Sequence, residues 1–338
     1  MQIQTFQTSL NSLDVFIQPN EILLDIETTG LSPDISTVFM IGCGYFHNQQ
    51  LHMIHWMADD LTLESEQDVL RSFSDWIHSK FEKHTSLSII TFNGKQFDLP
   101  FLQRRFNQCN ILWPSILNSE TAHADYFRIT SRIKHVLPIS NLKLHTLASF
   151  LGYKQTKTPS GRMLIKAYHK YIKEKDSATL NLLFKHNRED IEALAYVTSI
   201  QSYLHLFEGA YHIKSIEYSI DMSHILICLK TGFHFPCHLS ANKNGFKIDL
   251  NGANVQISVP VYNQGLRFYY SDYKNYIYLI EEDYALHKSM ATYIDKSHWT
   301  RANADNCYTW FAPDNAFFND MDLSKSYVQM IFSLFGFL

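Results

Sequence analysis

The stretch EILLDIETTG, residues 21–30, decides how the first part of the chain is interpreted. An apolar run leads into Asp25 and Glu27 and then stops at a Thr-Thr-Gly turn. Side chains two residues apart on a strand share a face, so these carboxylates project together, about 7 Å apart along the backbone. Like charges this close repel each other unless a cation joins them or one carboxylate is protonated. A hard divalent ion such as Mg²⁺ fits this pair, and a solvated strand end is the plain alternative.

Composition indicates a globular protein with enough apolar residues for a sizeable core. The chain has 338 residues, of which 46% are hydrophobic and 18% charged, enough for one large domain or two ordinary ones. Its five cysteines are scattered and never form a CxxC pair, which argues against a disulfide framework and a zinc knuckle. The N-terminal residues do not resemble a secretory signal, and the longest apolar run, MIFSLFGFL, is too short to span a bilayer. We expect a cytoplasmic protein without membrane contact.

Charge is unevenly distributed along the sequence. The net charge of −4 divides into −9 over residues 1–90, +9 over residues 91–190 and −4 over residues 191–338. The basic middle block suits a groove for phosphates, and a set of solvated helix faces is an equal alternative. Its members include Arg104, Arg105, Arg128, Arg132, Lys134, Lys154, Lys157, Arg162, Lys166, Lys170, Lys173 and Lys175.

The pattern of apolar residues predicts two domains, 1–206 and 207–338. In the first, strands are expected at 21–26, 37–46, 50–58 and 87–93, and helices at 63–83, 98–108, 141–151, 160–173 and 177–206. Strands followed by helices favour an α/β domain with a mixed central sheet between two helical layers. Residues 207–338 contain short strands separated by turn residues, followed by a helix expected at 283–294, which indicates a β-rich α+β domain.

Further acids are expected to meet the first pair. Asp98 stands where a helix begins after strand 87–93, although an acid there also suits a plain N-cap. His186 and Asp190 are one helical turn apart and share a face, although that face could simply be solvated. Together the four acids suit two Mg²⁺ or Mn²⁺ ions that clamp an in-line phosphoryl displacement. His186 could take the proton of the attacking water.

Three segments resemble the exonuclease motifs of the DEDD superfamily. They are Asp25-Ile-Glu27-Thr-Thr-Gly30-Leu31, Asn93-Gly-Lys-Gln-Phe97-Asp98 and His186-Asn-Arg-Glu-Asp190. Between the last two, Asn141-Leu-Lys143-Leu and then Leu151-Gly152 are similar to a helix of the same proteins. The resemblance covers about residues 20–205, and the closest likeness is to a bacterial branch of predicted exonucleases with an HN-x-x-D third motif. It implies a ribonuclease H-like fold and 3′–5′ exonuclease activity on DNA or RNA.

The resemblance also implies roles for particular residues. Asp25, Glu27, Asp98 and Asp190 would bind two Mg²⁺ or Mn²⁺ ions, and His186 would be the general base. The 3′ end of the nucleic acid would contact Thr28, Leu31, Asn93, Phe97 and Lys143, and no protein partner is implied. One departure concerns the base, because the histidine subclass places it five residues before the last Asp and the tyrosine subclass four. Here a histidine occupies the tyrosine-type spacing.

Other functions are compatible with parts of the pattern. An endonuclease or junction resolvase on the same fold is the alternative enzyme, and a decayed nucleic-acid-binding module is the alternative without catalysis. An aspartyl-phosphate phosphatase is disfavoured, because Glu27 stands where such enzymes carry a second Asp. The tyrosines of the β-rich domain could stack on bases, but filling a sheet core explains them better, and no reaction is assigned to that domain.

Overall fold

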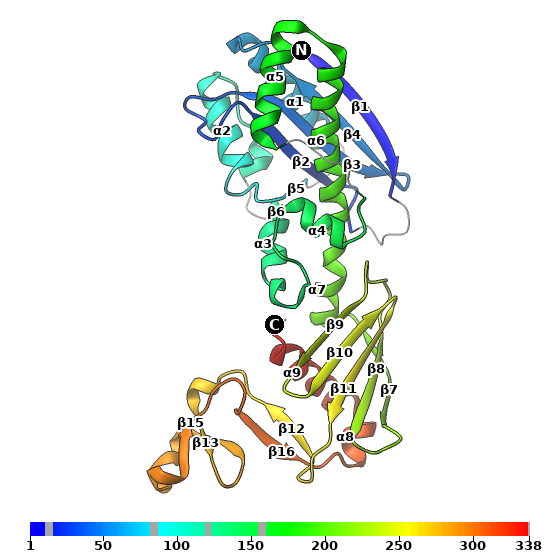
Figure 1. Ribbon diagram of the computed structural model, residues 1–338, viewed down its shortest axis with the longest axis vertical. Helices are drawn as coiled ribbons and strands as arrows, with labels where there is room; N and C mark the ends of the chain where they lie inside the picture. Colours follow the sequence, from blue (N-terminus) through cyan, green and yellow to red (C-terminus); the bar gives the residue numbers. More distant parts are fainter. Residues whose placement is uncertain (11–15, 82–86, 119–122, 155–159, 337–338) are drawn as a thin grey trace. The chain divides into compact units, whose positions relative to one another are not determined.

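The computed structural model describes residues 1–10, 16–81, 87–118, 123–154 and 160–336, which form two compact units (Figure 1). The first unit comprises Met1–Lys134 and Pro138–Ile200, and the second comprises His135–Leu137 and Gln201–Leu338. The change of unit after Ile200 lies close to the boundary predicted at residue 206. Among the described residues, no helix is both long and apolar enough to cross a membrane.

A mixed six-stranded sheet forms the centre of the first unit. In spatial order its strands are β1 (Gln2–Ser9), β4 (Gln50–Met57), β3 (Val38–His47), β2 (Glu21–Thr28), β5 (Ser88–Thr91) and β6 (His123–Asp125). The strands from β1 to β2 pair antiparallel, whereas β5 and β6 run parallel to β2. This arrangement confirms the predicted α/β domain with a mixed sheet.

Six α-helices accompany the sheet in the described part of the first unit. They are α1 (Leu63–Phe81), α2 (Asp98–Gln108), α3 (Tyr126–Ser131), α4 (Leu144–Phe150), α5 (Gly161–Glu174) and α6 (Ser177–Val197). The single helix predicted over 177–206 is wrong, because α6 gives way to a 3₁₀ turn at Thr198–Ile200 before α7 (Gln201–Phe207). At this break the hydroxyls of Thr198 and Ser199 donate to the carbonyl oxygens of Ala195 and Tyr196. Such side-chain bonds compete with the backbone hydrogen bonds of a helix and disturb it.

Helices pack on both faces of the sheet. On one face Gly42 and Gly44 of β3 leave room for α6, since a Cβ on Gly44 would lie 2.7 Å from Cγ2 of Ile191. On the opposite face Trp56 of β4 packs edge-on against the rings of Phe73 and Trp76 of α1. Because strand side chains alternate, Asp25, which lies opposite Gly42, points to the α6 face, while Leu24 and Ile26 point into the other core.

A buried ion pair joins α1 to α2 and corrects one sequence-based expectation. Arg105 Nη2 lies 2.5 Å from Glu66 Oε2, and both side chains are buried. Arg105 also donates to the carbonyl oxygen of Pro33 at 3.1 Å, while Glu66 Oε1 accepts from the backbone N–H of Val38. Arg105 therefore fixes the loop that follows β2 and is not part of a phosphate groove. Lys157, another member of the basic block, lies outside the described residues.

The second unit is built mainly from antiparallel strands, which confirms the predicted β-rich region. One sheet has the order β7 (His212–Tyr218), β8 (His224–Lys230), β11 (Asn254–Pro260), β10 (Phe246–Asn251) and β9 (Leu239–Lys243). The smaller pairings are β12 (Leu266–Tyr269) with β16 (Tyr308–Phe311), and β13 (Tyr276–Leu279) between β14 (Tyr284–His287) and β15 (Trp299–Arg301). Helices α8 (Asn315–Asn319) and α9 (Met321–Leu334) end the unit.

The helix predicted at 283–294 is wrong. Strand β14 pairs with β13 over its first part, and a 3₁₀ helix, Lys288–Tyr293, follows. Asp283 has a left-handed backbone (φ 55°), and its carboxylate accepts from the hydroxyls of Tyr278 and Tyr308. These bonds, one within the hairpin and one from β16, hold the turn that brings β14 back onto β13, so strand pairing overrides the helical spacing.

Candidate active site

Strand β2 presents the first two acids to helix α6. Asp25 lies opposite Gly42 and Glu27 opposite Met40 in the antiparallel register with β3. The register shifts between Glu27 and Thr28, so the regular pairing ends directly after the second acid. The two carboxylates therefore share one face at the end of a central strand, as the sequence predicts.

Asp98 reaches the same strand from the start of α2. Its Oδ1 accepts a hydrogen bond from the backbone N–H of Ile26 at 3.3 Å, between the two acids of β2, and the residue is 7% exposed. Phe97, and not Asp98, occupies the N-cap position of α2. The plain N-cap alternative is therefore wrong, because the Asp98 carboxylate bonds to the strand instead.

Helix α6 brings the remaining two side chains. His186 Nε2 lies 3.4 Å from Glu27 Oε1 and 3.4 Å from Asp190 Oδ2. One potential metal-ligand atom from each of these three residues lies within 4.8 Å of the other two, a spacing that suits a shared metal ion. His186 is only 8% exposed, so the alternative of a solvated helix face does not hold here.

Burial disfavours negative charge at all four carboxyl groups. It raises the pKa of Asp25 and Glu27 well above their usual values, and repulsion from Asp190 and Asp98 raises both further. Burial also raises the pKa of Asp98 and of Asp190 to about 7. It lowers the pKa of His186 to about 4, so this imidazole is neutral near pH 7.

The donor set fits divalent cations. Within the described ranges, no lysine or arginine forms an ion pair with any of the four carboxylates. Clustered carboxylate oxygens are the ligands that Mg²⁺ and Mn²⁺ prefer, and an adjacent imidazole suits Mn²⁺ better than Mg²⁺. A bound cation would remove the electrostatic cost of holding these acids ionised together.

The family follows from the sequence match over this same region. A model of the RNase_H superfamily matches residues 22–201, which contain all four acids and His186. The chain belongs to the ribonuclease H superfamily. This membership confirms the ribonuclease H-like resemblance that the three motifs predict, and with the acidic site it supports a nuclease. No curated protein sequence matches the chain.

Several solved structures share a weak overall likeness with this ribonuclease H superfamily member. A family B DNA polymerase from Pyrobaculum calidifontis is 15% identical with a TM-score of 0.43, over 56% of this chain and 25% of the polymerase. E. coli exonuclease I in complex with a dT13 oligonucleotide is 13% identical with a TM-score of 0.35, over 94% of this chain and 70% of that one. Likenesses of this strength carry no functional argument.

Two residues near the acids were not assigned a role from the sequence. His145 of α4 has its Nε2 3.2 Å from Asp190 Oδ1, so this carboxylate has an imidazole beside each oxygen. Asn187 donates from Nδ2 to Asp25 Oδ2 at 2.6 Å. Asn187 stands inside the third quoted motif, directly after His186, and His145 directly follows the quoted segment Asn141-Leu-Lys143-Leu. That neighbourhood is the signal that was available in the sequence.

The residues predicted to contact substrate differ in their accessibility. Leu31 is 87% exposed, together with Ile35 on the same loop, and Lys143 is exposed at the start of α4. By contrast, Thr28 Oγ1 donates to the carbonyl oxygen of Gly30, and Phe97 packs against Phe101. In the second motif the left-handed Asn93 (φ 66°) donates its backbone N–H to Asp125 Oδ1. Asp125 therefore shapes the loop and caps α3.

Part of the basic block forms an exposed row on α5. Its members, which we call the α5 stripe, are Arg162, Lys166, Lys170 and Lys173. Lys170 contacts Glu174 and Asp176 at 3.6 and 3.9 Å. Arg104 of α2 is exposed but paired with Asp34 at 2.7 Å. Among the described residues the ion pairs of the stripe involve Lys170, so most of the positive charge of the stripe stays accessible.

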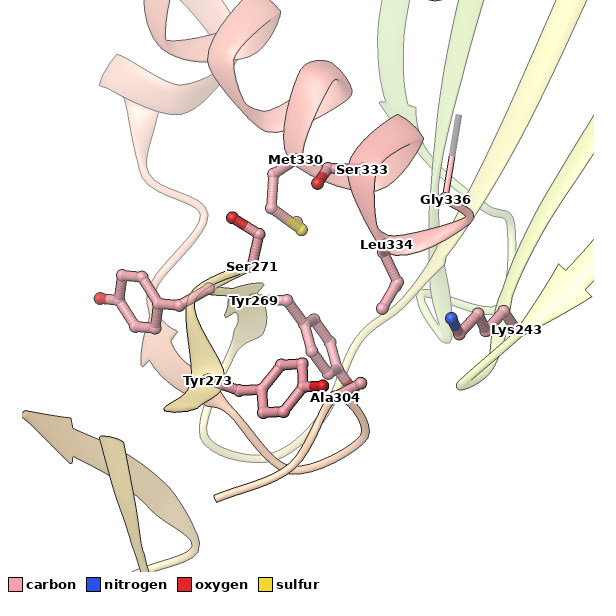
Figure 2. A pocket seen from close by; sticks show the side chains of 10 residues that line it. Lys243, Tyr269, Ser271, Tyr273, Ala304, Met330, Ser333, Leu334 and Gly336 are labelled. Atoms are coloured by element: carbon pink, nitrogen blue, oxygen red, sulfur yellow. The ribbon is translucent and has the colours of Figure 1, made fainter. Parts of the chain in front are cut away.

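The second unit contains a cavity of about 230 Å³ (Figure 2). Tyr269, Tyr270 and Tyr273 line it together with Ser271 and Lys243. Tyr269 also packs against the rings of Phe246 and Tyr308, as a core residue does. None of the candidate site residues lines this cavity, so it belongs to the second unit and not to the acidic site.

Proposed function

We propose that the chain is a metal-dependent 3′–5′ exonuclease that hydrolyses phosphodiester bonds of DNA or RNA. The observation that carries this proposal is the gathering of Asp25, Glu27, Asp98 and Asp190 in a largely enclosed cluster that, among the described residues, has no lysine or arginine partner. Superfamily membership and the order of the three exonuclease motifs support it. A decayed binding module is disfavoured, because all four acids are present.

The four acids would hold two Mg²⁺ or Mn²⁺ ions. When bound, such ions neutralise the carboxylates and stabilise the attacking and leaving oxygens of an in-line displacement. Asp98 is held to β2 by the Ile26 N–H, and Asp190 lies on a long helix capped by Asp176. The ligands thus come from regular elements, whose rigidity keeps their geometry fixed.

His186 would accept the proton of the attacking water. Its neutral imidazole faces Glu27 and Asp190, so a water held by these acids lies within its reach. A base of this kind must be unprotonated, and burial keeps it so near neutral pH. The same geometry also permits His186 to bind metal directly, and the Mn²⁺ affinity of His186→Ala distinguishes the two roles.

The surface around the loop after β2 suits the end of a nucleic-acid strand. Leu31 and Ile35 are nearly fully exposed. The same loop is held by Arg105, which donates to the carbonyl oxygen of Pro33, and by Arg104, which donates to the carboxylate of Asp34. Exposed aliphatic side chains on a fixed loop offer a surface for an unpaired terminal base. The α5 stripe offers positive charge for the phosphates.

End-labelled DNA and RNA, single-stranded and duplex, test the reaction directly in the presence of Mn²⁺. A 3′ label should be released at once as mononucleotide, while a 5′ label should appear on a ladder of progressively shorter fragments. Early internal cuts would favour the endonuclease or resolvase alternative. Asp25→Ala should abolish cleavage because it removes a direct ligand, and Asp75→Ala, at an exposed acid of α1, should not. A folded Asp25→Ala chain that cleaves at the wild-type rate would show that the site is misplaced.

His186→Ala should lower kcat about 10²–10⁴-fold, the usual contribution of a general base, with little change in Mn²⁺ affinity. His186→Tyr should keep part of the activity, since the four-residue spacing is the one that carries tyrosine in the resembled motif. His78→Ala, at an exposed histidine of α1, is the control. A loss of Mn²⁺ binding in His186→Ala would make this residue a metal ligand, and an unaltered kcat would remove it from the mechanism.

Reversing the charge of Arg162, Lys166 and Lys173 together should weaken nucleic-acid binding and its dependence on salt. Each lost phosphate contact should reduce the slope of log Kd against log salt concentration by about one. Binding is measured in the Asp25→Ala background, where cleavage does not interfere. Arg71→Glu on α1 is the matched control, because Arg71 is also exposed on a helix. A slope unchanged by the triple reversal would identify the stripe as a solvated face only.

A further inference from the structure

Asn187 is a polar side chain sealed between helix α6 and the sheet. The residue is 0% exposed, and its Nδ2 donates to Asp25 Oδ2 at 2.6 Å, across 162 residues of sequence. It follows His186 directly and precedes Asp190 on the same helix. One short segment of α6 therefore touches both acids of β2, Glu27 through His186 and Asp25 through Asn187.

Gly42 provides the space that the Asn187 amide occupies. It lies opposite Asp25 in the register of β2 and β3, and a Cβ there would lie 1.9 Å from Asn187 Oδ1 and 2.9 Å from its Cγ. Gly42 is not among the glycines with positive φ, so its backbone conformation does not require glycine. Glycine is required at position 42 because a larger residue would collide with the Asn187 amide.

We propose that Asn187 is a positioning residue for Asp25, seated by Gly42, and that their contact sets the affinity of the acidic site for divalent cations. The inference rests on the proposed function. With Oδ2 bonded to the amide, the carboxylate of Asp25 has one orientation, and Oδ1 is left for a cation. A neutral donor does this without adding charge to a cluster that already holds four acids. Hydrogen bonds to ligand carboxylates typically change metal affinity or activity about 10–100-fold.

Gly44 provides a matched control on the same strand. It lies two residues from Gly42 and also faces α6, where a Cβ would lie 2.7 Å from Cγ2 of the apolar Ile191. Gly44→Ala therefore crowds the same helix against the same strand without touching the amide. A difference between the two alanine variants isolates the polar contact from general overpacking.

The experiment measures Mn²⁺ binding by calorimetry and thermal unfolding in EDTA for the full chain and its variants. Asn187→Ala and Gly42→Ala should each weaken Mn²⁺ binding about 10–100-fold. The double variant Asn187→Ala/Gly42→Ala should bind Mn²⁺ no more weakly than Asn187→Ala alone, because the amide atoms with which an alanine at position 42 would collide are absent. The other close neighbour of that alanine would be His55 Cδ2 at 3.1 Å, which needs only a small shift. Asn187→Leu, similar in volume but without a donor, should bind as weakly as Asn187→Ala. Gly44→Ala should lower the unfolding temperature and leave Mn²⁺ affinity unchanged.

Three results would overturn the inference. The first is a wild-type Mn²⁺ affinity in Asn187→Ala or Asn187→Leu. The second is a loss of Mn²⁺ affinity on Gly42→Ala that is as large in the Asn187→Ala background as in the wild-type chain. The third is a loss of Mn²⁺ affinity in Gly44→Ala equal to that in Gly42→Ala. Asn187→Ala adds no atoms, so it tests the contact even if Gly42→Ala does not fold. A wild-type chain that binds no Mn²⁺ and cleaves nothing would instead overturn the proposed function, and the inference with it.

Discussion

Repulsion among four carboxylates, of which Asp98 is buried and the other three are half-buried, is the constraint on which the first unit depends. Two of them share a face of β2, and the others arrive from the start of α2 and from the long helix α6. Burial and mutual repulsion both act against their ionisation, so the surrounding elements must hold the acids together against an electrostatic cost. Such an arrangement is typical of a functional site, where local stability is given up for chemistry.

Packing around the cluster supplies the rigidity that this constraint demands. Gly42 and Gly44 let α6 approach β3 closely, and the Asn187 amide uses that room to bond Asp25. On the other side of the site, the buried pair Arg105–Glu66 joins α1 to α2 and fixes the loop after β2. Removing one partner of such a pair typically costs about 3–5 kcal/mol, because the other charge is left buried alone. Stability and site geometry therefore depend on the same contacts.

Local spacing in the sequence was enough to predict the acids, but not their surroundings. Asp25 with Glu27, and His186 with Asp190, follow from strand and helix periods, which tertiary structure did not override. The His145–Asp190 contact and the burial of Arg105 against Glu66 join distant segments, and no local pattern encodes them. Strand β1 was missed because its apolar residues, Ile3 and Phe6, lie three apart and do not show the period-two alternation that predicts a strand. At 283–294, strand pairing outweighed a helical spacing.

The central claim is that divalent cations hold these like charges together. Its most direct test compares thermal unfolding of the wild-type chain and of Asp25→Asn, in EDTA and in Mn²⁺, at a mildly alkaline pH above the pKa of about 7 of Asp98 and Asp190. In EDTA the Asn variant should unfold at the higher temperature, since one repelling charge is gone. Mn²⁺ should stabilise the wild-type chain strongly and the variant little, which reverses their order. A wild-type unfolding temperature that Mn²⁺ leaves unchanged, or an Asn variant less stable than wild type in EDTA, would contradict the account.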